Sequence, residues 1–262
     1  MNDILNTIIA AKRIEVAKAK LQTPLKSLIH QLDACNLPQV PSLAEALKSS
    51  PTGIIAEFKR KSPSKGWIKA DGDAAVIPVS YEQKGASALS ILTDREFFGG
   101  SDDDIIAARR SGVTLPVLYK NFVVDEYQLI QARLSGASAV LLIAAALSVD
   151  ECRSLRSRAK DLGMEVLLEM HSESELAYAD CIPDVCGVNN RNLGSFITST
   201  EQSLHLAGKL PADAIKVSES GISSPETVKE LRSAGFNGFL IGERFMREDY
   251  PALALHNFIS AL

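Results

Sequence analysis

Short apolar runs and longer amphipathic stretches alternate along the chain after residue 50. The apolar runs number eight, and most are hydrophobic at consecutive positions, as expected of strands buried on both faces. The predicted strands lie at 53–58, 88–92, 115–119, 139–143, 165–169, 185–189, 215–218 and 238–241.

Helical periodicity fills the intervals between these runs. Glycine ends or follows five of the predicted helices, at positions 85, 112, 136, 163 and 235, where a left-handed C-cap is favoured. The predicted helices lie at 73–84, 103–111, 125–135, 149–162, 173–179, 200–207, 225–234 and 244–261.

Eight strand–helix units in about 210 residues predict a (β/α)8 barrel, the TIM barrel of the α/β class. The alternative is a doubly wound open sheet, which commonly has a GxGxxG turn after its first strand, and no such turn occurs here. We expect residues 1–262 to form a single domain, with residues 1–48 packed on the barrel as an N-terminal helical extension. That extension is predicted to hold a helix beginning near Ile4 and short helices at 24–34 and 42–48.

Charged or amide side chains stand at the ends of several predicted strands. Glu57 and Lys59 lie two residues apart, so in a strand both side chains point to the same face. The other polar strand ends include Lys120, Glu169, Asn189 and Glu219. Each of these alone is typical of a solvated loop, but in a barrel the strand ends form one ring, which is where the active site lies. The sequence therefore predicts a shared site with proton-transfer or anion-binding chemistry.

The loops after the last two strands predict a phosphate site. Ser220 and Gly221 precede one helix, and Gly242 and Glu243 begin another. Backbone N–H groups at these places commonly bind phosphate in such barrels. The acidic Glu243 would repel a phosphate, so its side chain is expected to point away.

Composition narrows the function classes. A net charge of −4 gives no broad basic field, so a nucleic-acid partner is not expected. The four cysteines form no CxxC pair and are interpreted as buried, reduced thiols, and the four histidines form no metal motif. With no apolar stretch of membrane-spanning length and no secretory signal core, we expect a cytoplasmic protein without a membrane partner.

The chain resembles the indole-3-glycerol-phosphate synthase family over almost its whole length. The order of several segments makes the resemblance specific. These segments are IAEFKRKSPSKG at 55–66, LTD at 92–94, FFGGS at 97–101, LYKNF at 118–122, LEMH at 168–171, GVNNRNL at 187–193, SESGI at 218–222 and LIGE at 240–243.

The resemblance implies a lyase of tryptophan biosynthesis that needs no metal or organic cofactor. Its substrate would be 1-(2-carboxyphenylamino)-1-deoxyribulose 5-phosphate, which such enzymes convert to indole-3-glycerol phosphate, carbon dioxide and water by general acid–base catalysis. The fold that it implies is the barrel with an N-terminal extension. We expect a monomer, with a homodimer as the alternative.

The resemblance also implies roles for individual residues. Lys120 would be the general acid at the ketone oxygen, and Glu169 would handle a proton on the opposite side. Lys59 would hold the substrate carboxylate and is a second candidate donor, oriented by Glu57. The rest of the implied pocket comprises Asn189, Arg191, Glu219 and Ser220 in the lining, Ser62, Gly221, Gly242 and the backbone of Glu243 at the phosphate, and Phe98, Phe122, Leu142 and Leu193 around the aromatic ring.

Two residues depart from the usual pattern beside the candidate acid. Tyr119 and Asn121 flank Lys120, where members often have Arg or Cys before the lysine and Asp after it. Loss of a neighbouring negative charge is expected to change the pKa of the lysine.

Three other functions compete with this interpretation. A phosphosugar isomerase barrel would require a cysteine–aspartate acid–base pair at the strand ends, and no cysteine lies at the end of a predicted strand. A Schiff-base aldolase would use Lys59 or Lys120 as its nucleophile. A barrel that binds a phosphorylated metabolite without turnover would be expected to lack an acid or a base, yet both are present.

Overall fold

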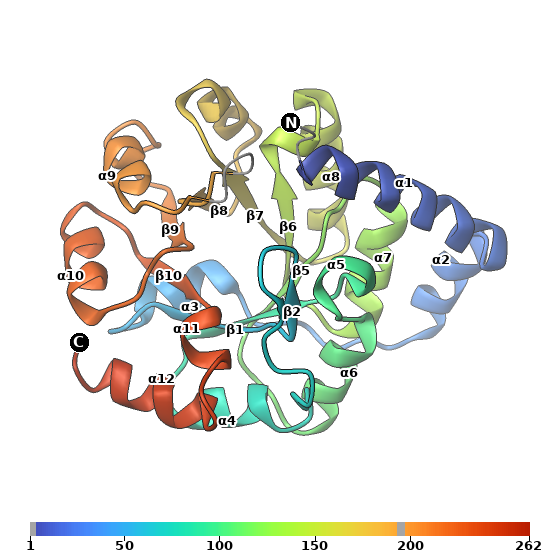
Figure 1. The fold of residues 1–262 in the computed structure, drawn as a ribbon. Coiled ribbons are helices and arrows are strands. Elements are labelled where there is room, and N and C mark those ends of the chain that lie inside the picture. Colours follow the sequence, from blue (N-terminus) through green and yellow to red (C-terminus); the bar gives the residue numbers. More distant parts are fainter. Residues whose placement is uncertain (1–3, 193–196) are drawn as a thin grey trace.

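Eight parallel strands close into a barrel that is surrounded by helices (Figure 1). The computed structural model describes residues 4–192 and 197–262. Around the barrel the strands run in the order β1-β10-β9-β8-β7-β6-β5-β4. Their bounds are β1 (Ile54–Phe58), β4 (Ala88–Leu92), β5 (Val117–Lys120), β6 (Ala139–Ile143), β7 (Glu165–Met170), β8 (Val185–Asn189), β9 (Ile215–Glu219) and β10 (Gly238–Ile241).

Helices connect successive strands and precede the first one. The α-helices are α1 (Ile4–Gln22), α2 (Leu25–Ala34), α3 (Leu43–Ser49), α4 (Ile77–Gln83), α5 (Arg95–Phe98), α6 (Asp102–Arg110), α7 (Glu126–Ser135), α8 (Val149–Asp161), α9 (Glu201–Ala207), α10 (Pro225–Ser233), α11 (Glu243–Met246) and α12 (Pro251–Ile259). Two further elements are the 3-10 segments η1 (Ala144–Ala146) and η2 (Glu173–Cys181), and a small hairpin is formed by β2 (Lys61–Ser62) and β3 (Gly66–Trp67).

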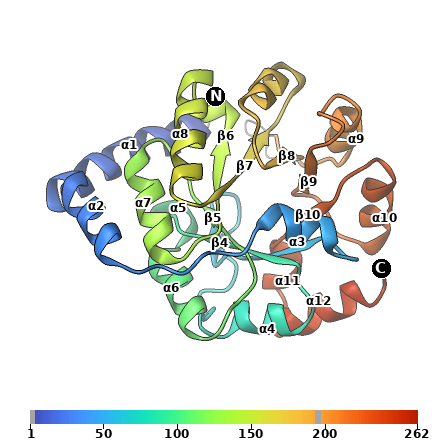
Figure 2. The ribbon, with the colours of Figure 1, turned by 180° about the vertical axis from the view of Figure 1, so that it is seen from behind.

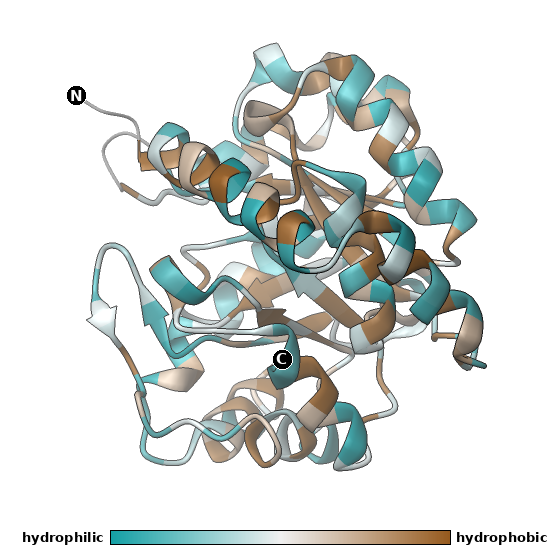
Figure 3. Ribbon diagram, turned by 90° about the vertical axis from the view of Figure 1, so that its right-hand side faces the viewer, coloured by the Kyte–Doolittle hydropathy of each residue, from teal (hydrophilic) through white to brown (hydrophobic). Residues whose placement is uncertain are grey.

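Side-chain alternation divides each barrel strand between two cores. One set of apolar residues packs between the strands and the helices, and it includes Ala56 and Leu168. The other set fills the barrel interior, and it includes Ile55 and Leu167. Figure 3 shows mostly hydrophobic strands inside helices that carry both hydrophobic and hydrophilic residues. Because both faces of each strand are buried, apolar residues occupy consecutive positions instead of alternating with polar ones, as the sequence predicted.

The N-terminal extension contacts both ends of the barrel. Helix α3 packs Leu43 and Leu47 against the interior core, and Figure 2 shows it lying across the back of the barrel. It is held there by Glu165, whose Oε2 accepts a hydrogen bond from the backbone N–H of Ala44 at 2.9 Å. Helix α1 contributes Leu5 to the interior core from the opposite end, where the strands terminate.

The predicted strands agree with the observed ones to within two residues, and the C-cap glycines at 85, 112, 136, 163 and 235 all have positive φ. The predicted helix at 244–261 is wrong as one element, because Pro251 cannot continue a helix and instead begins α12. The segment at 173–179 is a 3-10 helix, and the hairpin and α5 were not predicted. Cys35 is exposed, so the prediction of four buried thiols is wrong there.

Within the described residues, none of the helices combines the length and the hydropathy needed to cross a bilayer.

Candidate active site

A cavity of about 520 Å³ opens at the C-terminal ends of the barrel strands. Its size is typical of sites for small molecules. It is lined by most of the residues singled out from the sequence, namely Glu57, Lys59, Ser62, Phe98, Lys120, Phe122, Glu169, Asn189, Arg191, Glu219, Ser220, Gly221, Gly242 and Glu243. The predicted convergence of distant polar segments on one site is therefore observed.

Lys120 lies at the centre of the charged wall. Its Nζ is 3.0 Å from Glu169 Oε2, and it also donates a hydrogen bond to Glu219 Oε2. Lys120 and Glu219 end β5 and β9, and Glu169 is the second-last residue of β7. Each continues the inward-facing set of its strand, after Leu118, Leu167 and Val217. The alternation that buries leucine and valine in the barrel thus carries the ammonium and both carboxylates into the cavity.

The two carboxylates differ in their affinity for a proton. Burial penalises the charged form of each, but Lys120 and His171 outweigh burial at Glu169 and lower its pKa. At Glu219, burial and repulsion from Glu169 prevail over Lys120 and raise the pKa to about 7. For Lys120, burial opposes the charge, but Glu169 and Glu219 together raise its pKa above the usual value. Lys120 is therefore a charged ammonium and Glu169 a charged carboxylate at neutral pH, whereas Glu219 gains and loses a proton near neutral pH.

Lys120 keeps its proton without an aspartate at position 121. The buried side chain of Asn121 is turned to its own loop, where Nδ2 donates to Thr93 Oγ1 at 2.9 Å and Oδ1 accepts from the Phe122 N–H at 2.8 Å. Tyr119 points outward, and its hydroxyl donates to Asp102. The departures from the usual pattern beside the lysine thus leave its two inward carboxylate partners in place.

Glu57 and Lys59 form the second ion pair of the wall, as their spacing predicted. Lys59 Nζ is 2.7 Å from Glu57 Oε1, and Ser90 Oγ is 3.5 Å from Glu57 Oε2. Glu57 is buried, whereas the Lys59 side chain is more accessible, so the ammonium faces the cavity with its carboxylate behind it. This geometry presents a positive charge to an anionic ligand.

His171 was quoted in a motif but given no role, and it lies beside Glu169. Its Nε2 is 3.2 Å from Glu169 Oε1, and its Nδ1 is 3.8 Å from Glu175 Oε2. Burial opposes the charged imidazolium, but Glu169, Glu175 and Glu219 raise the pKa of His171 above its usual value. Glu169 therefore has a second basic partner, because the imidazole of His171 lies at its Oε1 whereas Lys120 lies at its Oε2.

The far end of the cavity is built from loops with small residues. Gly221 and Gly242 line it together with Ser62 and Ser220, and Ser220 has a φ of 67°, which is uncommon outside glycine. The carbonyl oxygen of Ser220 accepts a hydrogen bond from Asn190 Nδ2, which fixes this turn. The backbone is thus exposed to a ligand, as a phosphate site requires.

Cations surround this end of the cavity beyond those expected. The carboxylate of Glu243 faces the hairpin, with Oε1 3.8 Å from Lys65 Nζ. Arg244 and Arg247 also line the cavity, and Arg247 was not singled out from the sequence. The sequence feature that indicates their position is the segment Glu243-Arg244-Phe245-Met246-Arg247, which places basic residues just after the last strand.

The apolar wall of the cavity is formed partly by residues that the sequence did not identify. Leu142 does not line the cavity but packs on the helix side of β6, so its assignment is corrected to its neighbours Leu141 and Ile143. Successive side chains of a strand point to opposite faces, so an assignment that is wrong by one residue selects the wrong face. Leu193 lies outside the described residues.

Helix α1 supplies a further part of the apolar wall through Ile4, Leu5 and Ile8. These positions were recognised as the start of an amphipathic helix, but not as part of the site. Periodicity indicates that a helix buries one face without telling what that face covers.

Comparisons with known proteins agree on one family. A family model described as indole-3-glycerol phosphate synthase matches residues 5–258. A protein of Bacteroides thetaiotaomicron with the same description is 54% identical over 262 residues, which is all of both chains. Indole-3-glycerol phosphate synthases of Polaromonas naphthalenivorans and Dechloromonas aromatica are 44% and 45% identical over 258 residues, covering 97% of this chain and 98% of each relative.

The raised pKa of Glu219 predicts a pH-dependent stability that Glu219→Gln abolishes. Between the usual carboxyl value of 4.5 and about 7, the native protein keeps a proton that the unfolded chain releases. The free energy of unfolding should therefore fall as pH rises through this window, by up to about 3 kcal/mol relative to the variant. Urea unfolding of both proteins at several pH values measures this difference. Parallel pH dependences would show that Glu219 titrates normally.

Proposed function

The chain belongs to the indole-3-glycerol phosphate synthase family, and we propose that it closes the indole ring of 1-(2-carboxyphenylamino)-1-deoxyribulose 5-phosphate. The observation that carries this proposal is the row of charges in one cavity, with Lys120 between Glu169 and Glu219 and Lys59 on the neighbouring wall. The reaction needs a proton donor, a proton acceptor and a cation for the departing carboxylate, and these side chains supply all three.

The proton balance of the reaction sets what the residues must do. The ring carbon that bears the carboxylate bonds to the ketone carbon, whose oxygen takes one proton. The carboxylate leaves as carbon dioxide, and its electron pair restores the aromatic ring. The new hydroxyl then leaves as water with a second proton, while a base removes one proton from the carbon beside the nitrogen. Two protons are supplied and one is removed, so each turnover consumes one proton.

Lys120 is the donor to the ketone oxygen in this proposal. Its ammonium is held by two buried carboxylates and faces the cavity, so the charged form is present when substrate binds. A positioned acid of this kind typically accelerates a reaction by about 10²–10⁴-fold.

Glu169 is the proposed base, and its contacts impose an order on the steps. While Lys120 is protonated, its charge lowers the pKa of Glu169 and makes it a weak base. Once Lys120 has given its proton to the substrate, that influence disappears and Glu169 binds a proton more strongly. Donation by the lysine thus prepares the carboxylate to act, and the 3.0 Å contact between them offers a direct path for returning the proton.

Lys59 is proposed to bind the substrate carboxylate and to serve as the second donor. Its ammonium is oriented by Glu57 at 2.7 Å, which limits the positions that a bound carboxylate can take. Asn189 and Arg191 line the same cavity and are proposed to contact the substrate's hydroxyl groups.

The phosphate is proposed to lie at the glycine-rich end of the cavity. Ser62, Ser220, Gly221, Gly242 and the backbone of Glu243 line this region. The aromatic ring would then lie against the pair formed by Phe98 and Phe122, whose ring centroids are 5.9 Å apart. Phe98 and Phe122 border the charged wall, so this placement puts the reacting carbons next to Lys120.

The two carboxylates beside Lys120 also argue against the Schiff-base alternative. A lysine nucleophile must lose its proton, which burial next to another cation or in an apolar pocket favours. Lys120 has two carboxylate partners, and these raise its pKa. Acid catalysis is therefore the role that its surroundings support.

We further infer a cytoplasmic enzyme acting as a monomer, with a homodimer as the alternative. Among the described residues the four cysteines are unpaired thiols, as in a reducing compartment. Size-exclusion chromatography with light scattering distinguishes the two assemblies.

Replacing the proposed acid should nearly abolish turnover. Lys120→Met is expected to lower kcat by at least about 100-fold, because it removes the proton donor while keeping an apolar stem. Lys216→Met is the matched control, since Lys216 is also buried on a barrel strand but donates to the Ala207 carbonyl outside the cavity. Indole fluorescence during incubation with the substrate measures both. A Lys120→Met enzyme as fast as the control would contradict the assignment, and a wild type that makes no indole would contradict the function.

Gly242 should be required for the Glu57–Lys59 pair. A Cβ atom at this position would lie 2.4 Å from Glu57 Oε1, the oxygen that binds Lys59. Gly242→Ala must therefore displace the carboxylate, and kcat/KM should fall by at least about 10-fold. In Gly208→Ala, no atom beyond the adjoining residues of the chain lies within 4 Å of the added methyl group, so the same assay should show normal activity. Equal activity of the two variants would rule out this steric role.

A further inference from the structure

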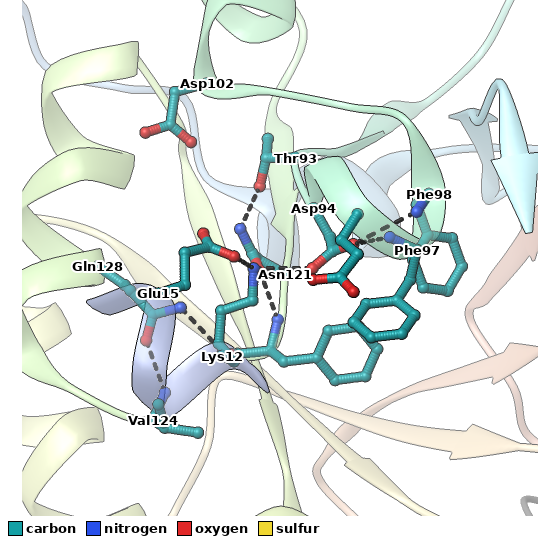
Figure 4. Close-up of polar contacts among 12 residues, drawn as sticks. Lys12, Glu15, Thr93, Asp94, Phe97, Phe98, Asp102, Asn121, Val124 and Gln128 are labelled. Carbon is teal, nitrogen blue, oxygen red and sulfur yellow. Dashed lines mark hydrogen bonds and ion pairs between the residues drawn. The ribbon is translucent and has the colours of Figure 1, made fainter. Parts of the chain in front are cut away.

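A buried ion pair joins helix α1 to the loop after β4. Lys12 Nζ is 2.7 Å from Asp94 Oδ2, and each side chain is only 1% exposed. Figure 4 shows the lysine reaching from the helix toward Asp94 and Glu15. Glu15 Oε2 is 2.8 Å from the same ammonium but is half exposed, so Asp94 is its buried partner.

This pair occupies a place where an apolar contact would be expected. The buried face of α1 consists of Leu5, Ile8, Lys12 and Val16, so the lysine interrupts a hydrophobic stripe. Taking two charges out of water costs several kcal/mol per ion, and apolar replacements of such pairs are often at least as stable. Stability alone therefore does not account for a lysine here, whereas a fixed geometry between two elements does.

Asp94 transmits this geometry to the aromatic wall of the cavity. It is the N-cap of α5, and its Oδ1 accepts hydrogen bonds from the N–H groups of Phe97 at 2.7 Å and Phe98 at 3.3 Å. Phe98 lines the cavity, and its ring lies against that of Phe122. The same aspartate thus orients the short helix that carries Phe98 and receives the charge from α1 (Figure 4).

Lys12 also fixes the part of α1 that borders the cavity. Ile8 precedes it by one helical turn and lies on the same face, and Ile4 and Leu5 follow toward the N-terminus. All three line the cavity. The ion pair therefore joins two apolar segments that both line the cavity, one from the extension and one from the loop after β4.

We propose that the Lys12–Asp94 ion pair is a positioning device for the ring-binding part of the site. It holds Ile8 and Phe98 at a fixed separation before the substrate binds, so that the aromatic ring of the substrate packs against side chains that are already ordered. Lys12 touches no reacting atom in this role. The inference rests on the proposed function, because it assigns this wall to the ring of that substrate.

Lys12→Met tests the proposal against a control on the same helix. Lys20→Met breaks the pair of α1 with Asp125, another N-cap aspartate, at 2.7 Å but away from the cavity. Two probes are titrated into each protein: the substrate with its ketone reduced to an alcohol, which carries ring and phosphate but cannot cyclise, and inorganic phosphate, which lacks the ring. Calorimetry gives the Kd values, and indole fluorescence gives kcat and KM.

The expected pattern separates positioning from general damage. Lys12→Met should raise the Kd of the reduced substrate by about 3- to 10-fold, because one or two side chains must then be ordered on binding. It should also raise KM more than it lowers kcat. Phosphate affinity should stay within about twofold of the wild type, and Lys20→Met should bind both probes normally. Equal losses for the two probes, or equal effects of the two variants, would overturn the proposal.

A second variant covers the outcome in which Lys12→Met does not fold because Asp94 is left buried and unpaired. In Lys12→Met/Asp94→Asn, both charges are gone and the amide oxygen can still cap α5. This variant should show the same selective loss of the reduced substrate, and normal binding would overturn the proposal. A wild type that binds neither the reduced substrate nor the substrate itself would instead overturn the proposed function on which the inference rests.

Discussion

One ammonium group, held between two buried carboxylates, governs the electrostatics of the barrel mouth. Lys120 lies between Glu169 and Glu219, two buried carboxylates that would otherwise repel each other. Removing one partner from such a group leaves an uncompensated charge, which typically costs about 3–5 kcal/mol. The three residues come from strands far apart in the sequence, so only closure of the barrel brings them together. Fold and chemistry depend on the same geometry.

That arrangement also gives the neighbouring groups their different roles. Glu169 has two basic partners, Lys120 and His171, which together outweigh burial and lower its pKa. Glu219 shares the lysine without the histidine and has a pKa of about 7. Two glutamates with the same intrinsic chemistry thus differ because their charged neighbours differ. An enzyme that both donates and removes protons in one cavity requires such a difference.

Local rules explain which parts of this site the sequence could predict. The shared face of Glu57 and Lys59 follows from strand alternation alone, and the turn glycines follow from backbone sterics. Leu142 was misassigned because β6 is apolar on both faces, so nothing in its sequence distinguishes inside from outside. The partnership of Lys12 with Asp94 depends on how α1 docks. Its one sequence signal is a lysine on a buried helical face, which does not name the partner.

The protonation state of Lys120 is the most direct test of this account. Carbon-13 NMR of lysine labelled at Cε, with Lys120 assigned by comparison with Lys120→Arg, follows deprotonation of each ammonium as pH rises. The Lys120 signal should keep its charged position beyond the pH at which exposed lysines titrate, about 10.4. A Lys120 that titrates with the exposed lysines, or below them, would contradict an ammonium stabilised by two buried carboxylates and the acid role built on it.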